Sequence, residues 1–124
     1  MQAETLKKLI NDVITKKAES QTIEIKSAEH GCPTRLFDTL SSFSNQDDGG
    51  IIFFGIDEKN NFAIKGVYDA QDLQKKVTEQ CKQMEPAVRA LFTMCEIGEK
   101  ILVSAEIPGV DVSDRPVFYK GVGR

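Results

Sequence analysis

The chain has 124 residues, of which 16 are basic and 19 acidic, giving a formal net charge of −3. This length suits one domain with one core, and the acidic balance argues against a general polyanion binder. No apolar run approaches the ~18 residues of a membrane helix, and the N-terminus has no signal-peptide pattern. Three widely separated cysteines, Cys32, Cys81 and Cys95, fit reduced thiols. We therefore expect a single cytoplasmic domain, residues 1–124, without a membrane partner.

The first elements combine a helix with a half-exposed strand. Apolar residues at three- and four-residue spacing predict an amphipathic helix over Ala3–Lys17. Residues Thr22–Lys26 alternate with period two, which predicts a strand with two core-facing isoleucines. Glu24 and Lys26 would then share the opposite face of that strand.

The next elements are a second helix and a buried strand. Pro33 is well placed to open a helix that runs to about Gln46. The glycine pair at 49–50 ends this helix. The run Ile51–Ile56 is apolar without alternation, which predicts a central strand covered on both sides. Asp57 follows at its carboxyl end.

The second half of the chain predicts one more helix and mostly β structure. A short strand is expected around Ala63–Gly66, and Asp69 is expected to cap a third helix that ends before Pro86. Leu91–Ile97 and Ile101–Ile107 read as a hairpin, with alternate residues of the second strand, including Ile101, pointing inward. A last strand is expected at Val117–Lys120. The order predicts an α+β fold with about three helices and a mixed sheet.

Three acidic residues are candidates for chemistry. Glu19, Glu24 and Asp57 converge if the strand carrying Glu24 lies beside the central strand. Carboxylate oxygens suit Mg²⁺ or Mn²⁺, ions that stabilise phosphoryl-transfer charge and activate water. The alternative is that each is an ordinary solvated carboxylate, or that Glu24 pairs with a lysine. The residues alone leave both interpretations open.

His30 and Cys32 do not predict a further site. A zinc site would need two more ligands, while Cys81 and Cys95 lie in segments expected to be core. A Cys–His nucleophile pair on so short a loop lacks a third group to orient the base. No cofactor is expected, apart from Mg²⁺ or Mn²⁺ if the carboxylates are catalytic.

Several basic residues are candidates for phosphate contact, each with a solvated surface charge as its alternative. They are Lys26, Arg35, Lys65, Arg115, Lys120 and Arg124. Arg35 is placed in the first turn of the expected second helix, where it could join backbone amides in holding an anion.

An ordered series of residues runs through most of the chain, from about Glu19 to Gly123. It comprises Glu19, Glu24-Ile25-Lys26, a helix ending at residues 40–45, the segment 49–57, Gly66-Val67, Pro86, the strand 101–107 and Arg115-Pro116-Val117-Phe118-Tyr119. The series resembles the Schlafen-type AlbA-like DNA-binding domain.

This resemblance implies an α+β domain that usually forms the N-terminal part of bacterial transcriptional regulators or helicase-related ATP-binding proteins. In animal Schlafen proteins, related domains cleave tRNA and rRNA with three carboxylates. Those would correspond to Glu19 and Glu24, with their five-residue separation, and to Asp57. Lys26 would contact the nucleic-acid backbone. Related domains continue past the last strand, so we expect this chain to be an N-terminal piece of a longer protein whose C-terminal region is missing.

The leading hypothesis is a nucleic-acid-binding domain of a bacterial transcriptional regulator, with DNA as the first ligand to test and RNA as the second. An alternative from the enzyme class is a metal-dependent endoribonuclease that uses Glu19, Glu24 and Asp57. A third is a protein-interaction or dimerisation module that forms a homo-oligomer. Salt-sensitive binding favours the first hypothesis, because phosphate contacts release counterions.

Overall fold

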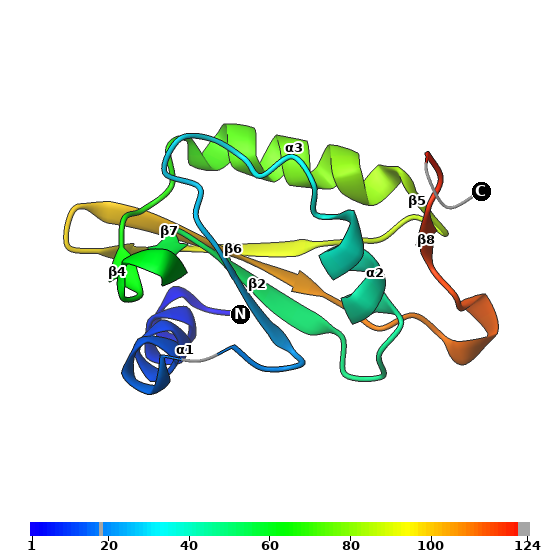
Figure 1. Ribbon diagram of the computed structural model, residues 1–124, viewed down its shortest axis with the longest axis horizontal. Coiled ribbons are helices and arrows are strands. Elements are labelled where there is room, and N and C mark those ends of the chain that lie inside the picture. The colour runs from blue at the N-terminus through cyan, green and yellow to red at the C-terminus, as the bar shows by residue number, and fades with distance from the viewer. Residues whose placement is uncertain (18, 122–124) are drawn as a thin grey trace.

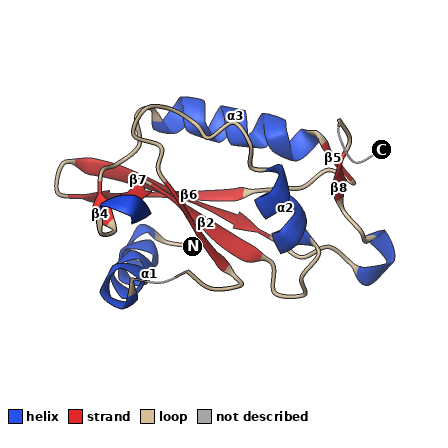
Figure 2. Ribbon diagram, in the orientation of Figure 1, coloured by secondary structure: helices blue, strands red, loops and turns tan. Residues whose placement is uncertain are grey.

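A four-stranded sheet organises the computed structural model, which describes residues 1–17 and 19–121 (Figure 1). Its strand order is β1-β2-β7-β6, with β1 parallel to β2 and the other neighbours antiparallel. Helices and strands both contribute to the core, so the fold is α+β with a mixed sheet, as the sequence predicts (Figure 2).

In chain order the elements are α1 (Ala3–Lys16), β1 (Ile23–Lys26), α2 (Phe37–Ser44), β2 (Gly50–Phe54), β3 (Ile56–Asp57), η1 (Glu58–Asn60), β4 (Ala63–Ile64), α3 (Ala70–Lys82), β5 (Met84–Glu85), β6 (Leu91–Ile97), β7 (Lys100–Ile107), η2 (Val112–Asp114) and β8 (Phe118–Tyr119).

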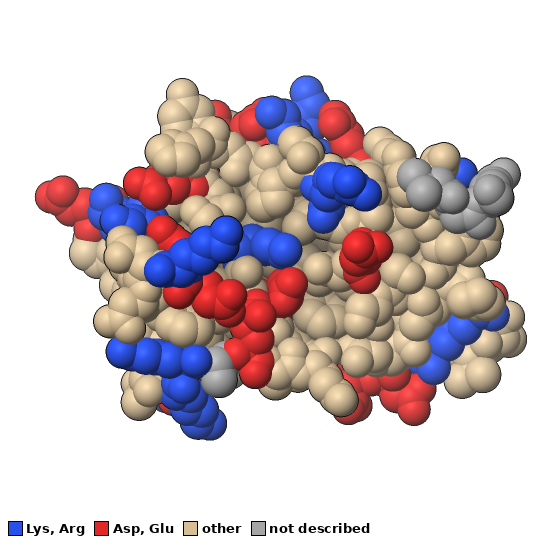
Figure 3. Space-filling model, in the orientation of Figure 1, with Lys and Arg blue, Asp and Glu red and all other residues tan. Residues whose placement is uncertain are grey.

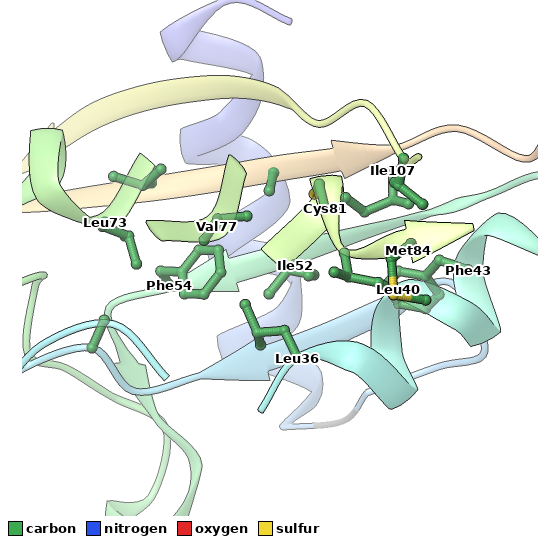
Figure 4. Packing of buried hydrophobic residues seen from close by; sticks show 14 of the residues in the cluster. Leu36, Leu40, Phe43, Ile52, Phe54, Leu73, Val77, Cys81, Met84 and Ile107 are labelled. Carbon is green, nitrogen blue, oxygen red and sulfur yellow. The ribbon is translucent and has the colours of Figure 1, made fainter. Parts of the chain in front are cut away.

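The sheet is covered on both faces. α1 packs on one face, and α2 and α3 pack on the other (Figure 1). Because side chains of a strand alternate between faces, β2 sends Ile52 and Phe54 to the α2–α3 side and Phe53 to the α1 side. The prediction that this strand is central and covered on both sides is confirmed. Figure 4 shows the α2–α3 side, where Phe54 lies beside Val77 and Leu73 of α3.

Three expected details differ from the structure. α2 begins at Phe37, four residues after Pro33, because the amide of Leu36 is bonded to the side chain of Gln80 on α3 before helical bonding starts. The predicted strand over 51–56 is split at Gly55, whose φ of 113° bends the chain out of the sheet and into β3. Ile101 is 37% exposed instead of buried; it pairs with Glu96 next to the pair that closes the β6–β7 hairpin, at the end of the sheet.

The predicted third helix and hairpin are confirmed. Asp69 caps α3 by accepting a 3.0 Å hydrogen bond from the Asp72 amide. β6 and β7 pair in an unbroken register from Leu91 to Ile97. The pairing of β5 with β8 was not predicted; it holds the C-terminal segment near the end of α3. None of the helices within residues 1–17 and 19–121 combines the length and the apolar character needed to cross a membrane.

Candidate functional site on the β1 edge

β1 forms one edge of the sheet and carries two of the predicted site residues. Glu24 and Lys26 lie opposite Ile52 and Phe54 of β2, so β1 and the central strand are neighbours, as the carboxylate hypothesis requires. The Lys26 ammonium lies 3.5 Å from Oε1 of Glu24, and about 30% of each side chain is exposed. The alternative in which Glu24 pairs with a lysine is therefore part of this structure.

Glu19 has a structural contact on the same edge. Its Oε2 accepts a 2.7 Å hydrogen bond from the backbone amide of Ile25. A turn closed by reciprocal 3.3 Å bonds between Ser20 and Ile23 brings the chain back alongside β1. Glu19 thus supplies an acceptor to an edge strand that has no neighbouring strand on that side among residues 1–17 and 19–121.

The carboxylates of this edge crowd one another. The pKa of Glu24 is raised by partial burial first and by the adjacent carboxyl of Glu19 second, and Lys26 opposes this shift. The pKa of Glu58 is also raised, by desolvation and then by the charge and contact of Glu19, although Glu58 is exposed. Like charges at short range disfavour ionisation. Glu19 is therefore the shared neighbour of two other carboxylates.

Asp57, the predicted third carboxylate, has a different partner. Its Oδ1 accepts a 3.2 Å hydrogen bond from the amide of Lys59 and caps η1. The neighbouring Glu58 is the residue whose carboxyl approaches Glu19. Within residues 1–17 and 19–121, no group of three His, Cys, Asp or Glu side chains is arranged to hold a metal ion. The donor set of this conformation does not fit a three-carboxylate metal site.

Two hollows flank the sheet near these residues. A small one of about 280 Å³ adjoins Glu24 and is lined mainly by hydroxyl, amide and carboxyl side chains from the Ser20–Gln21 turn and α2, including Asp38 and Ser42. A larger, mostly apolar groove of about 850 Å³ lies beside α1, between the starts of β1, β2 and β6 and the end of β7. None of the clustered carboxylates lines the larger groove. The volume of a hollow therefore does not identify the candidate catalytic residues.

Lys26 and Lys65 lie on either side of Gly55. The Gly55 amide donates a 3.0 Å hydrogen bond to the Lys26 carbonyl, and its own carbonyl accepts a 2.9 Å bond from the Lys65 amide. The structure thereby brings together two of the predicted phosphate contacts that are 39 positions apart in sequence. The Lys65 side chain has no ion-pair partner among the described residues.

Arg35 is exposed and lies in the segment that leads into α2, not in the first turn of the helix as expected. That segment is fixed from α3 by the buried side chain of Gln80. Its Oε1 accepts from the Leu36 amide at 2.9 Å, and its Nε2 donates to the Pro33 carbonyl at 2.8 Å. Arg35 is therefore an exposed cation on an anchored backbone.

The other basic candidates are separated from this edge or already bonded. Arg115 donates from Nε and Nη2 to the Val110 carbonyl at 3.1 and 2.9 Å, and from Nη2 to Asp47 at 2.9 Å. Lys120 lies 4.0 Å from Glu85 near the C-terminal end. Arg124 lies outside the described residues.

Figure 3 shows how charge is distributed over the face that carries β1. The main group of acidic side chains lies left of the middle, and basic side chains lie directly above and below it. The arrangement offers separate cationic points around an acidic centre and no continuous basic stripe. Such points can contact phosphates one at a time.

The thiols are unsuited to nucleophilic chemistry. Burial raises the pKa values of Cys32 and Cys81 to about 11, so both stay protonated at neutral pH. Cys81 is a residue of α3 whose side chain lies in the core, as predicted (Figure 4).

Sequence reasoning missed two residues of this region. Glu58 follows the candidate Asp57 directly, and the segment after the β3 strand brings its carboxyl toward Glu19. Gln80 is a polar residue on the buried face of α3, next to Cys81. That position is itself a signal, because a buried amide requires partners.

Comparisons with known proteins agree with this fold. Residues 19–122 match the family model described as Schlafen, AlbA_2. The solution structure of the N-terminal domain of a RecG-related protein from Nitrosomonas europaea superposes with a TM-score of 0.78 at 24% identity, covering 94% of this chain and 81% of that one. The crystal structure of DIP2311 from Corynebacterium diphtheriae gives 0.57 at 15% identity, covering 95% of this chain and 24% of that one. No curated protein matches the sequence.

Proposed function

The chain belongs to the Schlafen AlbA_2 family, and from that premise we propose that it is a nucleic-acid-binding domain that contacts phosphates through the β1 face. The observation that carries the proposal is the placement of Lys26 and Lys65 on either side of Gly55, with Arg35 exposed on its anchored segment. The N-terminal location of the similar domain in a helicase-related protein supports the same role. The finer proposal is duplex DNA binding within a bacterial, cytoplasmic transcriptional regulator.

The acidic centre limits how such binding works. A nucleic acid laid across Glu19 and Glu24 would be repelled, so the phosphates must pass along Lys65 and Arg35, while Lys26 lies beside Glu24 and offsets part of its charge. A few separate contacts give modest affinity with a clear salt dependence, since each neutralised phosphate adds about 0.9 to the logarithmic salt slope. We expect a slope of about −2 to −4.

The experiment is a fluorescence-anisotropy titration of the domain with labelled duplex DNA and with structured RNA at several salt concentrations. Arg35→Ala/Lys65→Ala should weaken binding and reduce the salt slope by about 2. The matched control, Lys8→Ala/Lys82→Ala, removes two exposed lysines from α1 and α3 and should change affinity much less. Salt-independent binding, or equal losses in both double variants, would contradict the proposed face.

A metal-dependent endoribonuclease is the second candidate, and the crowding of Glu24 and Glu58 against Glu19 favours it. The lack of a three-ligand grouping in the described residues counts against it. Glu24→Gln and Glu58→Gln should each abolish Mn²⁺-stimulated cleavage of structured RNA while binding persists. Cleavage that survives in both variants would exclude this carboxylate site.

A further inference from the structure

The second edge of the sheet is open in the described part of the chain. β6 is the terminal strand opposite β1, and it pairs only with β7 in the described part of the chain. Proteins usually guard a long edge with lysine, proline or a bulge. Residues 91–97 contain no lysine and no proline and carry one charged residue, Glu96, and the pairing with β7 runs without a bulge.

The backbone groups on this edge point away from the molecule. β6 and β7 are joined by the two-residue turn Gly98–Glu99, with Gly98 at a φ of 63° as a tight hairpin requires. The residues flanking such a turn form a hydrogen-bonded pair, so every second residue of β6 bonds inward. Phe92, Met94 and Glu96 therefore direct their amides and carbonyls outward. No backbone bond to another described segment satisfies them.

Apolar side chains accompany this open edge. Leu91 is 61% exposed and Met94 50% exposed, although they lie on opposite faces of the strand. Leu91 also lines the apolar groove beside α1. An edge with unpaired amides and flanking apolar side chains is a template for another strand.

The charges at the ends of β6 identify the partner. Arg89 and Glu99 are exposed, and neither has an ion-pair partner among the described residues. Each lies five positions from Met94, on opposite sides of it. In an antiparallel pairing of two copies centred on Met94, the segment before β6 of each copy, with Arg89, therefore comes near the hairpin turn of the other, with Glu99.

From this self-complementarity we propose that the β6 edge is a homodimer interface, in which two copies pair antiparallel about Met94. The pairing would form about six backbone hydrogen bonds, cover Leu91 with Ile97 of the second copy and join the two sheets into one. It goes beyond nucleic-acid binding, because the β1 faces would remain open at the two far edges of the joined sheet.

Sedimentation velocity over a concentration series tests the interface. The wild-type domain should shift from monomer to dimer as concentration rises. Met94→Lys places two ammonium groups across the twofold axis and should leave a monomer. Val112→Lys makes the same kind of change on the exposed η2 segment, at 73% exposure, and should preserve the dimer. A wild-type monomer at every soluble concentration, or equal dimerisation of the Met94→Lys variant, would overturn the proposal.

Charge reversal identifies the register. Arg89→Glu alone and Glu99→Arg alone each create like-charged pairs at both ends, and each should raise the dimer dissociation constant about tenfold. An equimolar mixture of the two variants restores opposite charges at both ends and should recover dimer formation. If mixing gives no recovery, the antiparallel register about Met94 is wrong. A folding defect in either variant cannot mimic recovery, because mixing does not repair a misfolded chain.

Discussion

The Glu19 carboxylate and the Ile25 amide are joined by a 2.7 Å hydrogen bond along the outer edge of β1. The bond gives Glu19 a role in holding the strand that presents Glu24 and Lys26. A residue that the family resemblance assigns to catalysis thus also stabilises the local fold. Any loss of activity on changing Glu19 must be compared with the stability of the same variant.

Removing this acceptor should destabilise the domain. Glu19→Ala leaves the partly buried Ile25 amide without its partner and should lower the free energy of unfolding by about 1–2 kcal/mol. Glu19→Gln keeps an acceptor oxygen and should cost less. Urea denaturation measures both, with Glu79→Ala on the exposed side of α3 as the control. Equal midpoints for Glu19→Ala and the control would show that the bond contributes nothing in solution.

The crowded carboxylates predict a specific pH dependence. The folded-state pKa of Glu24 is raised, chiefly by burial and then by Glu19, so the native state holds its proton more tightly than the unfolded chain does. The associated penalty is absent below the ordinary carboxyl pKa and grows as pH rises through the raised value. Glu24→Gln should therefore make the domain more stable relative to wild type at neutral pH than at pH 4.

Paired urea titrations of wild type and Glu24→Gln at both pH values test this sign. The gain should be small, because Glu24 is partly exposed and water screens its interactions. Glu29→Gln serves as the control for removing one carboxylate elsewhere. A larger advantage of Glu24→Gln at pH 4 than at neutral pH would contradict the assigned direction.

The predictable parts of the fold depend on local patterns. Asp69 before an apolar helical stripe and the double-sided run after Gly50 each specify an element from neighbouring residues alone. α3 begins where the sequence places it, and β2 follows the predicted strand as far as Phe54, before the bend at Gly55. The start of α2 was mispredicted because it depends on Gln80, 44 positions away from Leu36. Pro33 indicates a helix start only from its neighbours in sequence. The buried hydrogen bond between Leu36 and Gln80 joins residues too far apart for such a local pattern to include.

The site was predictable in part for the same reason. The approach of Glu24 to Lys26 follows from strand alternation. The approach of Glu58 to Glu19 depends on the bend at Gly55 and on the pairing of β3 with β4. A resemblance that aligns Asp57 with a family position does not show which way its side chain points. Here that carboxyl caps η1.

Gln80 should control the order of the segment that carries Arg35. Gln80→Leu removes the acceptor for the Leu36 amide and the donor for the Pro33 carbonyl, and should lower stability by about 2 kcal/mol or more. Hydrogen exchange at the Leu36 amide should accelerate beyond the global change. Gln83→Leu, at the exposed residue that follows the last turn of α3, is the matched control. Unchanged protection of Leu36 would mean that the segment is held by packing alone.

Arg115 and Arg35 should respond in opposite ways to the same substitution. Arg115 is bonded three times, to the Val110 carbonyl and to Asp47, so Arg115→Ala should lower stability by about 1–3 kcal/mol. It should leave nucleic-acid affinity and its salt slope unchanged in the folded protein.

Arg35 has no such bonds in the described chain, so Arg35→Ala should leave the urea midpoint unchanged, weaken binding and reduce the slope by about 1. Arg115→Lys keeps the positive charge but removes the guanidinium group. Because one ammonium cannot make the same set of hydrogen bonds, the stability of this variant should still fall. If Arg115→Ala instead reduces the salt slope at full stability, Arg115 contacts phosphate, and the nucleic-acid path extends from the β1 face to the C-terminal segment.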